Sequence, residues 1–476
     1  MLVGMSVHGP LGATPQSGGL ELTRRARSLG LADRALARRA AQETRTGLIG
    51  LAGLLVCGLV ISISAAQSDS LLPETVRPLP GSLAGLFGTG GPDIHAAGVI
   101  AVLSLMFVSY AVAVGAAQRL SARAVLMSIA ALHALMLLAP PLLSTDIFSY
   151  QAYARMGALY GANPYLHGPY AIAHDPLFPY IGAKWSYMPT AYGPVFTGLS
   201  YILAPLSVAA GVIAYKSIAA VASLATVALV WNAARLRGLD PVKAAALVGL
   251  NPLLVVYGVG SGHNDLLMLL ALAAGTYVVL ARRERAGGAL MMLATGVKLT
   301  AGLLLPFALA GGGARRGRGP RRDLLIGAGA AAAALIAFSA ALFGGGALHL
   351  LATVRQSQSE GDWHSIPGFI STRLGLAPVG HVAGLALAGM FVLACCWLLR
   401  RVWRGELDWI DGAAWATVAM LLTASSLLPW YVAWLLPLAA LASDRRLVRT
   451  SIVVTGVVMG IQLLGYIPHA STQFGL

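Results

Sequence analysis

Apolar segments of about 18 to 25 residues, each separated by a short polar stretch, follow one another along most of the chain. A helix of that length crosses the roughly 30 Å hydrocarbon layer of a bilayer. No regular alternation of apolar and polar residues indicates a transmembrane β-barrel. The pattern therefore predicts an all-α polytopic membrane protein with about 11 to 14 transmembrane helices.

Basic residues fix the orientation of these helices, because Lys and Arg accumulate in short cytoplasmic loops. Residues 1–46 are rich in Gly, Pro and Ser and then in Arg, and we expect them to form a disordered basic tail in the cytoplasm. The remainder is expected to be one transmembrane domain, residues 47–470, followed by a short outer tail, 471–476. Its expected outer loops are 67–94, 146–190, 259–265 and 346–376. One expected helix, 122–143, leads to the second of these loops, and residues 191–234 are expected to form two helices with a break near Pro205.

Two segments are too short to cross the membrane twice. The basic blocks 282–285 and 314–322 both favour the cytoplasm, yet only the residues 286–313 separate them. Two crossings need about 60 Å, whereas a helix of this length supplies roughly 42 Å. We expect two short helices that meet near Lys298, and a similar hairpin over 411–443 with its tip at 425–431. Such tips persist only inside protein or beside a wet cavity, which indicates an internal polar site.

Residues 144–169 form the most polar part of the expected outer surface. Asp146 is followed at helical spacing by Tyr150, Tyr153 and Arg155, which predicts one short helix with a polar and aromatic face. A carboxylate there can serve as a general base toward a sugar hydroxyl, with Asp146 the candidate. The alternatives are a solvated helix end or a structural pair with Arg155, and single aromatic residues at a membrane boundary are often only anchors.

The other outer polar residues suit glycosyl transfer from a phosphate-linked donor. A departing phosphate needs fixed cations or hydrogen-bond donors, and aromatic rings stack on sugar faces. The candidates for phosphate binding are Lys298, Arg355, His364, Arg373 and Arg155. The candidates for sugar or acceptor binding are Tyr150, Tyr153, Asn163, Tyr165, Tyr192, His263, Asn264, Asp265, Trp363, Trp430 and Tyr431.

Two of these candidates have alternative interpretations. His263, Asn264 and Asp265 have no second His or carboxylate at the spacing that metal ligands need, so we expect no metal site there. They either start a helix or contact sugar and phosphate. Lys298 lies in an apolar segment, where a charge is costly and indicates function, although its side chain can also reach toward the interface.

Five motifs resemble those of a known family: DIFSYxxYARxxxxxGxNPY at 146–165, YGP at 192–194, GHND at 262–265, TGVKL at 295–299 and PWYxxWLLP at 429–437. They are similar to motifs of actinobacterial α-1,6-mannosyltransferases that use polyprenyl-phosphate mannose, which belong to the GT-C glycosyltransferases. The resemblance covers roughly residues 47–470.

The resemblance implies an inverting transferase without a cofactor or metal, acting at the outer face of the cytoplasmic membrane. It implies transfer of mannose from polyprenyl-phosphate mannose to a mannoside 6-hydroxyl of a lipid-linked mannan, which extends the backbone of lipomannan and lipoarabinomannan. In this superfamily the catalytic Asp follows the first helix, whereas Asp146 follows the third. Asp69, Glu74 and Asp93 in loop 67–94 therefore remain alternative bases.

Other functions are less well supported by the sequence. The net charge of +15 comes from short Arg blocks between apolar segments and not from one basic stripe, so we expect no nucleic-acid partner. A lipid or sugar transporter also has broken helices, but such proteins often show two related halves, and no repeat of the outer motifs is present. A GT-C transferase for another sugar or linkage stays open, because it needs the same residues.

Overall fold

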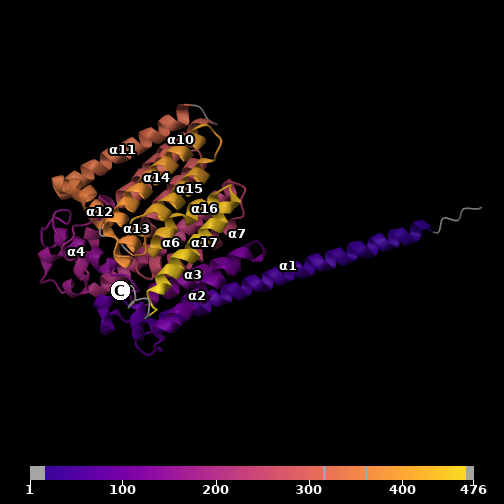
Figure 1. Cartoon of the computed structure of the whole chain (residues 1–476), viewed down its shortest axis with the longest axis horizontal. Helices are drawn as coiled ribbons and strands as arrows, with labels where there is room; N and C mark the ends of the chain where they lie inside the picture. The colour runs from indigo at the N-terminus through magenta and orange to yellow at the C-terminus, as the bar shows by residue number, and fades with distance from the viewer. Residues whose placement is uncertain (1–16, 315–317, 360–362, 468–476) are drawn as a thin grey trace, which may run out of the picture.

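The computed structural model describes residues 17–314, 318–359 and 363–467, and within these ranges the chain is helical without any strand. The helices pack into one bundle, from which a single long helix projects (Figure 1). Six helices are long and apolar enough to cross a membrane, and a bent pair makes a possible seventh. The chain is thus an all-α polytopic membrane protein. Six more apolar helices have only 10–17 residues, so the total of 11 to 14 crossings stays a prediction.

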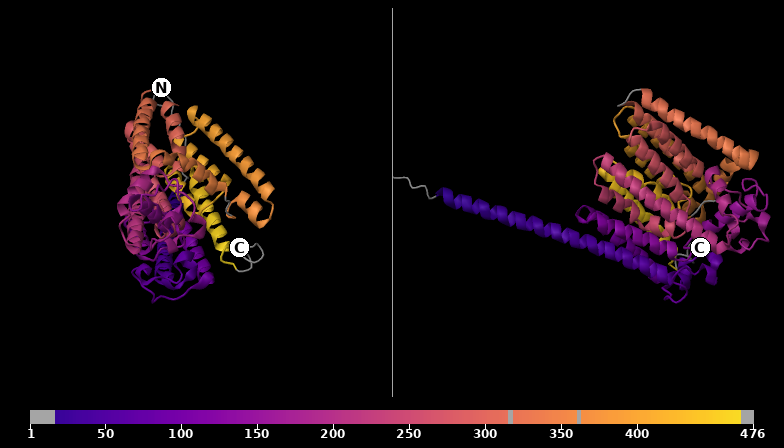
Figure 2. Two further views of the ribbon diagram at one scale, coloured as in Figure 1. Left: turned by 90° about the vertical axis from the view of Figure 1, so that its left-hand side faces the viewer. Right: turned by 180° about the vertical axis from the view of Figure 1, so that it is seen from behind.

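The N-terminal segment differs from the expected disordered tail. α1 spans Ser17–Ser64, so residues 17–46 are helical, and the right-hand view in Figure 2 shows α1 continuing into the bundle as a single helix. Ala, Leu, Arg and Glu favour helix, and they outweigh the Gly and Ser residues after position 17. Residues 1–16 and the expected outer tail 471–476 lie outside the described residues.

α1 packs against α2, His95–Gly115, and α3, Ala122–Leu138. α3 begins at the side chain of Ser121, which accepts a hydrogen bond from the Ala124 amide. It ends before the adjacent Pro140 and Pro141, which have no amide hydrogen, and is therefore shorter than the expected 122–143. The extended chain that follows leads directly to Asp146.

The polar stretch after α3 forms the expected short helix, α4, Asp146–Ala158. Residues 147–156 are all buried, so α4 is packed into the bundle on most sides. The expected break near Pro205 is also present: α5, Pro194–Ser200, and a 3₁₀ turn to Leu203 precede the long α6, Val208–Leu236. α4 lies against both α5 and α6.

The next two helices bring the GHND motif to α4. α7, Pro241–Gly249, is followed by a π-helical segment, Leu253–Val259, which bends from it by 48°. α8, Asp265–Leu280, starts inside the motif. The turn between them has Gly262 at φ +70°, a conformation that a residue with a Cβ rarely adopts.

Both expected hairpins are confirmed. α9, Glu284–Val297, and α10, Leu304–Ala314, are joined by an extended Lys298 and a 3₁₀ turn. α15, Trp409–Thr423, and α16, Leu436–Leu441, are joined by residues 424–428 and a 3₁₀ segment, Pro429–Trp434. The remaining helices are α11, Arg318–Phe343; α12, Leu350–Ser359; α13, Ile366–Gly368; α14, Ala377–Trp403; and α17, Arg445–Leu464.

We predict that the close packing of α9 and the neighbouring α11 depends on Gly327. A Cβ at Gly327 would lie 1.8 Å from the Arg285 carbonyl oxygen, whereas a Cβ at Gly329 in the same helix meets nothing within 4 Å. Small residues let membrane helices approach this closely. Gly327→Ala should lower the free energy of unfolding in detergent by about 1–3 kcal/mol, and the matched Gly329→Ala should not. Equal melting curves for the two variants would contradict this packing.

Candidate active site

Asp146 lies where three separate segments converge. It is the first residue of α4, and its side chain remains 18% exposed. One carboxylate oxygen, Oδ2, lies 3.4 Å from Nδ1 of His263. The Asp146 amide donates to the hydroxyl of Ser144, which fixes the start of the helix. The predicted base therefore has a neighbouring ring that can orient it.

The GHND turn is held by Tyr150, one turn along α4. The Tyr150 hydroxyl lies 3.3 Å from Nδ1 of His263 and donates to Oδ1 of Asn264 at 3.3 Å. The imidazole also stacks on Trp430 of the second hairpin, with ring centroids 3.7 Å apart. α4, the GHND turn and this hairpin thus meet at His263.

Asp265 and Lys298 form a buried ion pair beside this contact. Lys298 donates from Nζ to Oδ1 of Asp265 at 2.8 Å, and the same oxygen accepts a hydrogen bond from Nε1 of Trp434 at 2.7 Å. The ammonium also lies 4.9 Å from the ring centroid of Tyr431 and 5.1 Å from that of Trp434, within the range of cation–π attraction. The tips of both hairpins therefore meet at one charge pair.

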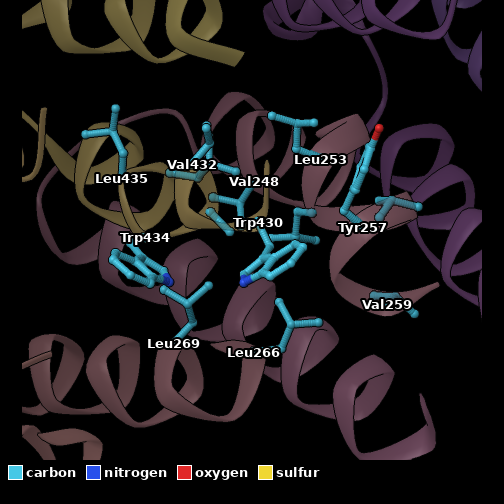
Figure 3. Close-up of a cluster of buried hydrophobic side chains, with 14 of the residues drawn as sticks. Val248, Leu253, Tyr257, Val259, Leu266, Leu269, Trp430, Val432, Trp434 and Leu435 are labelled. Atoms are coloured by element: carbon cyan, nitrogen blue, oxygen red, sulfur yellow. The ribbon is translucent and has the colours of Figure 1, made fainter. Parts of the chain in front are cut away.

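The aromatic residues of the second hairpin also belong to the core. In Figure 3 the indole rings of Trp430 and Trp434 lie next to Leu266 and Leu269 of α8. Burial of these rings supplies much of the apolar packing that fixes the hairpin tip.

Burial changes the acid–base properties of the site. Desolvation raises the pKa of Asp146 to about 6, and the positive charge of Lys298 opposes part of this increase. Desolvation lowers the pKa of His263 well below its ordinary value, and Lys298 lowers it further. Near neutral pH His263 is therefore uncharged, and Asp146 is mostly ionised and able to accept a proton.

Three consecutive residues of the motif each retain a buried polar atom without a partner in the described part of the protein. These atoms are Nε2 of His263, Nδ2 of Asn264 and Oδ2 of Asp265. Leaving a buried polar atom unpaired costs about 1–3 kcal/mol. Donors and acceptors of this kind are suited to the hydroxyl or phosphate groups of a ligand.

A mainly apolar pocket lies between the two hairpins. Its lining includes Met268 and Leu272 of α8, Thr300 and Leu304 of the first hairpin, and Trp434 of the second. Because Trp434 also contacts Asp265, the pocket adjoins the Lys298–Asp265 pair. The pocket holds only about 20 Å³, the space of one or two water molecules, so it is an apolar gap beside the charge pair and not a channel for a lipid chain.

Arg155 differs from its expected role. The sequence suggested a phosphate contact or a brace for Asp146, but the buried guanidinium pairs with Asp175 at 2.7 Å and also donates to the Leu206 carbonyl. Tyr160 donates to the other Asp175 oxygen, Oδ2. Asp175 lies 20 residues after Arg155 in the expected loop, so the sequence could not identify it as the partner. Arg155 braces the loop after α4.

Three of the predicted sugar-binding residues have contacts within the protein. Tyr153 donates its hydroxyl to the Met188 carbonyl, and Tyr165 donates to the Tyr192 carbonyl. Asn163 donates to the Phe343 carbonyl and accepts from the Tyr165 amide. These contacts shape the loop behind the site, while Tyr192 packs edge-on against Tyr150 with ring centroids 4.9 Å apart.

The loop that follows α12 reaches the second hairpin. The Trp363 ring lies between His364, at a centroid distance of 4.0 Å, and the guanidinium of Arg373, at 4.6 Å. Ser365 donates to the carbonyl of Ser425 at the hairpin tip. Arg355 is exposed on α12. A phosphate-binding role for Arg355, His364 and Arg373 stays a prediction.

The alternative carboxylates lie in other surroundings. Asp69 and Glu74 line a separate pocket with Arg77 and Tyr466. Asp93 pairs with the exposed His95 at 2.8 Å. The contacts of Asp146 with the GHND turn make it the better candidate. Within residues 17–314, 318–359 and 363–467, no three His, Cys, Asp or Glu side chains are grouped as metal ligands.

Comparison with known proteins gives consistent matches along the chain. A model of the MptA_B family, described as the N-terminal domain of alpha-(1->6)-mannopyranosyltransferase, matches residues 44–311, and the MptB C-terminal domain model matches 366–469. The chain is 30% identical over 343 residues to alpha-(1->6)-mannopyranosyltransferase A of Mycobacterium tuberculosis, covering 65% of this chain and 64% of that protein. It is 27% identical over 353 residues to alpha-(1->6)-mannopyranosyltransferase B of Corynebacterium glutamicum, covering 64% and 57%.

The matched region spans less than two thirds of the length of these relatives. No solved structure matches the chain significantly.

We predict that Lys298 and Asp265 are strongly coupled. Removing one member of a buried ion pair costs roughly 3–5 kcal/mol, because the other charge is left uncompensated. Lys298→Met and Asp265→Asn should each lower the melting temperature in detergent substantially, and the double variant should lose less than their sum. The exposed pair Arg285–Asp323 offers the control, where the same cycle should show little coupling. Additive losses at Lys298 and Asp265 would contradict the pairing.

Proposed function

Because this chain belongs to the α-(1→6)-mannopyranosyltransferase family, we propose that it transfers mannose from polyprenyl-phosphate mannose to the 6-hydroxyl of a mannoside acceptor. The product is an α-1,6-mannan chain one residue longer, of the kind that forms the backbone of lipomannan and lipoarabinomannan. The reaction takes place at the outer face of the cytoplasmic membrane. The observation that carries this proposal is the convergence of Asp146, the GHND turn and Lys298.

Asp146 is the proposed general base. As the acceptor oxygen O6 attacks C1 of the donor mannose, its proton passes to the Asp146 carboxylate. The bond from C1 to the phosphate oxygen breaks on the opposite side, so a β-linked donor gives an α-linked product. His263, 3.4 Å away and uncharged, orients the carboxylate toward the acceptor.

Lys298 is the proposed partner of the departing phosphate. Breaking the C1–O bond leaves negative charge on the polyprenyl phosphate, and a fixed ammonium stabilises it most where water is excluded. Asp265 and Trp434 hold Lys298 in place, while Arg355 of α12 and the later residues His364 and Arg373 add positive charge or donors.

The sugars are proposed to lie along the aromatic residues of the site. Tyr431 is partly exposed at the hairpin tip. Trp430 stacks on His263 of the GHND turn, and Tyr192 packs edge-on against Tyr150. Aromatic rings offer flat apolar faces to the C–H groups of a sugar. The unpaired atoms of His263, Asn264 and Asp265 are available to the hydroxyl groups.

The substitution Asp146→Asn tests the proposed base. It removes the proton acceptor with almost no change in size, so the transfer rate should fall by roughly 10²–10⁴-fold. Mannosylation of an α-1,6-mannoside acceptor by the purified full-length protein measures this rate. Polyprenyl phosphate should still raise the melting temperature of the variant, because its binding stabilises the folded state. Asp323→Asn, on the surface of α11, is the control and should keep wild-type turnover. Wild-type turnover by Asp146→Asn would remove Asp146 as the base.

The pH dependence of the transfer rate tests the same base. Because Asp146 has a pKa of about 6 and acts in its ionised form, kcat/KM should rise about tenfold per pH unit below 6 and level off above it. Lys298 lowers this pKa, so the acid limb of any residual activity in Lys298→Met should move to higher pH. A rate independent of pH between about 5 and 7 would exclude a base with this pKa.

A further inference from the structure

Lys216 is a second buried lysine, outside the proposed site. It lies in the N-terminal third of α6, and only 1% of its surface is exposed. Its Nζ donates to the carbonyl oxygens of Ala139 and Pro140, at 2.9 Å for Pro140. A lysine inside an apolar membrane bundle is costly, and this cost requires a reason.

The chain after α3 explains the need for a donor at this place. The last carbonyl groups of a helix have no partner within it, and Pro140 and Pro141 have no amide hydrogen to offer. Ala139 and Pro140 are buried, so their carbonyls need a partner within the protein. An ammonium group has three donors and can hold two carbonyls at once.

The stem of Lys216 also touches the GHND turn. A Cβ at Gly262 would lie 3.3 Å from Cγ of Lys216 and 2.7 Å from Cδ1 of Ile147, the residue after Asp146. The turn therefore passes close to both side chains, and its φ of +70° at Gly262 also favours glycine. Lys216 therefore contacts both the segment before Asp146 and the turn before His263.

Two hydrogen bonds link these segments directly. Ser261 donates its hydroxyl to the Leu142 carbonyl at 2.5 Å, and the Leu142 amide donates to the Gly260 carbonyl at 3.3 Å. Residues 139–147 and 260–265 thus form one junction, and Lys216 supports it from α6. The 3.4 Å contact of Asp146 with His263 lies at the end of this junction.

We propose that Lys216 is a positioning residue, which holds the segment carrying Asp146 against the turn carrying His263. It acts through these backbone segments and does not contact the reacting groups. Its effect on transfer rests on the function proposed above, whereas its effect on the two segments does not. The test therefore measures both.

The first measurement is hydrogen–deuterium exchange in the purified full-length protein. Lys216→Met keeps the length of the stem and removes the donors, so amides in residues 142–149 and 260–266 should exchange at least several-fold faster. Ser223→Ala is the matched control. Ser223 lies two turns further along α6 and contacts His133 of α3 at 2.8 Å, so its loss disturbs the same helix pair away from the junction. Unchanged exchange in Lys216→Met, or equal changes in both variants, would overturn the proposal.

The second measurement is the pH profile of transfer. Lys216→Met should lower kcat by about 10-fold or more, shift the acid limb of the profile, and leave KM for the lipid donor within about threefold. Ser223→Ala should leave the position of the acid limb unchanged. If Lys216→Met does not fold, Ser261→Ala tests the same junction and should give the same shift with a smaller loss of rate. Wild-type kcat and pH profile in a folded Lys216→Met, or in Ser261→Ala when Lys216→Met fails, would contradict the positioning role.

Discussion

The Lys298–Asp265 pair is the interaction on which the arrangement of the site depends. Both charges lie inside an apolar bundle, where neither is stable without the other. Their contact requires α8 to begin at Asp265 and the first hairpin to place its break at Lys298. The hydrogen bond from Trp434 adds the second hairpin to the same carboxylate. One charge pair therefore ties together three segments that are far apart in the sequence.

The same constraint explains the irregular backbone around the site. Non-helical chain inside a membrane protein must have its polar groups paired by other parts of the protein. The hairpin break at Lys298 is packed between α8 and the second hairpin, and the turn after α3 is paired by Lys216 and Ser261. These two irregular segments are thus stabilised by polar side chains from neighbouring helices, Asp265 of α8 and Lys216 of α6. Asp146 gains its raised pKa from this burial, while its remaining exposure leaves it accessible.

Much of the fold could be predicted from hydrophobic patterning, because helix length and the membrane thickness are directly comparable. The two hairpins were predictable for this reason, whereas the short α4 followed from the helical spacing of its polar residues and the break before α6 from Pro205. The helical state of residues 17–46 was not, since Gly and Ser near the start of α1 concealed a segment rich in helix-forming residues. The end of α3 was also misjudged, although Pro140 and Pro141 mark it in the sequence.

The residues of the site could be predicted from the sequence, but most of their contact partners could not. Asp146, the GHND motif and Lys298 were found because polar residues are unusual beside apolar segments. The partners of Arg155 and Lys298 were not, because they lie 20 and 33 residues away in other segments and tertiary packing decides the pairing. Lys216 satisfies the same rule that identified Lys298, a charge within an apolar helix, and could have been found by applying it throughout.

The proposed function assigns the transfer of mannose to a 6-hydroxyl to the cluster around Asp146 and Lys298. A panel of polyprenyl-phosphate sugars, incubated with the full-length protein and an α-1,6-mannoside acceptor, tests it most directly when products are read by mass and by linkage analysis. We expect an acceptor extended by one mannose in α-1,6 linkage, with polyprenyl-phosphate mannose as the preferred donor. Preference for another sugar, a different linkage, or movement of the lipid across a membrane without any product would contradict it.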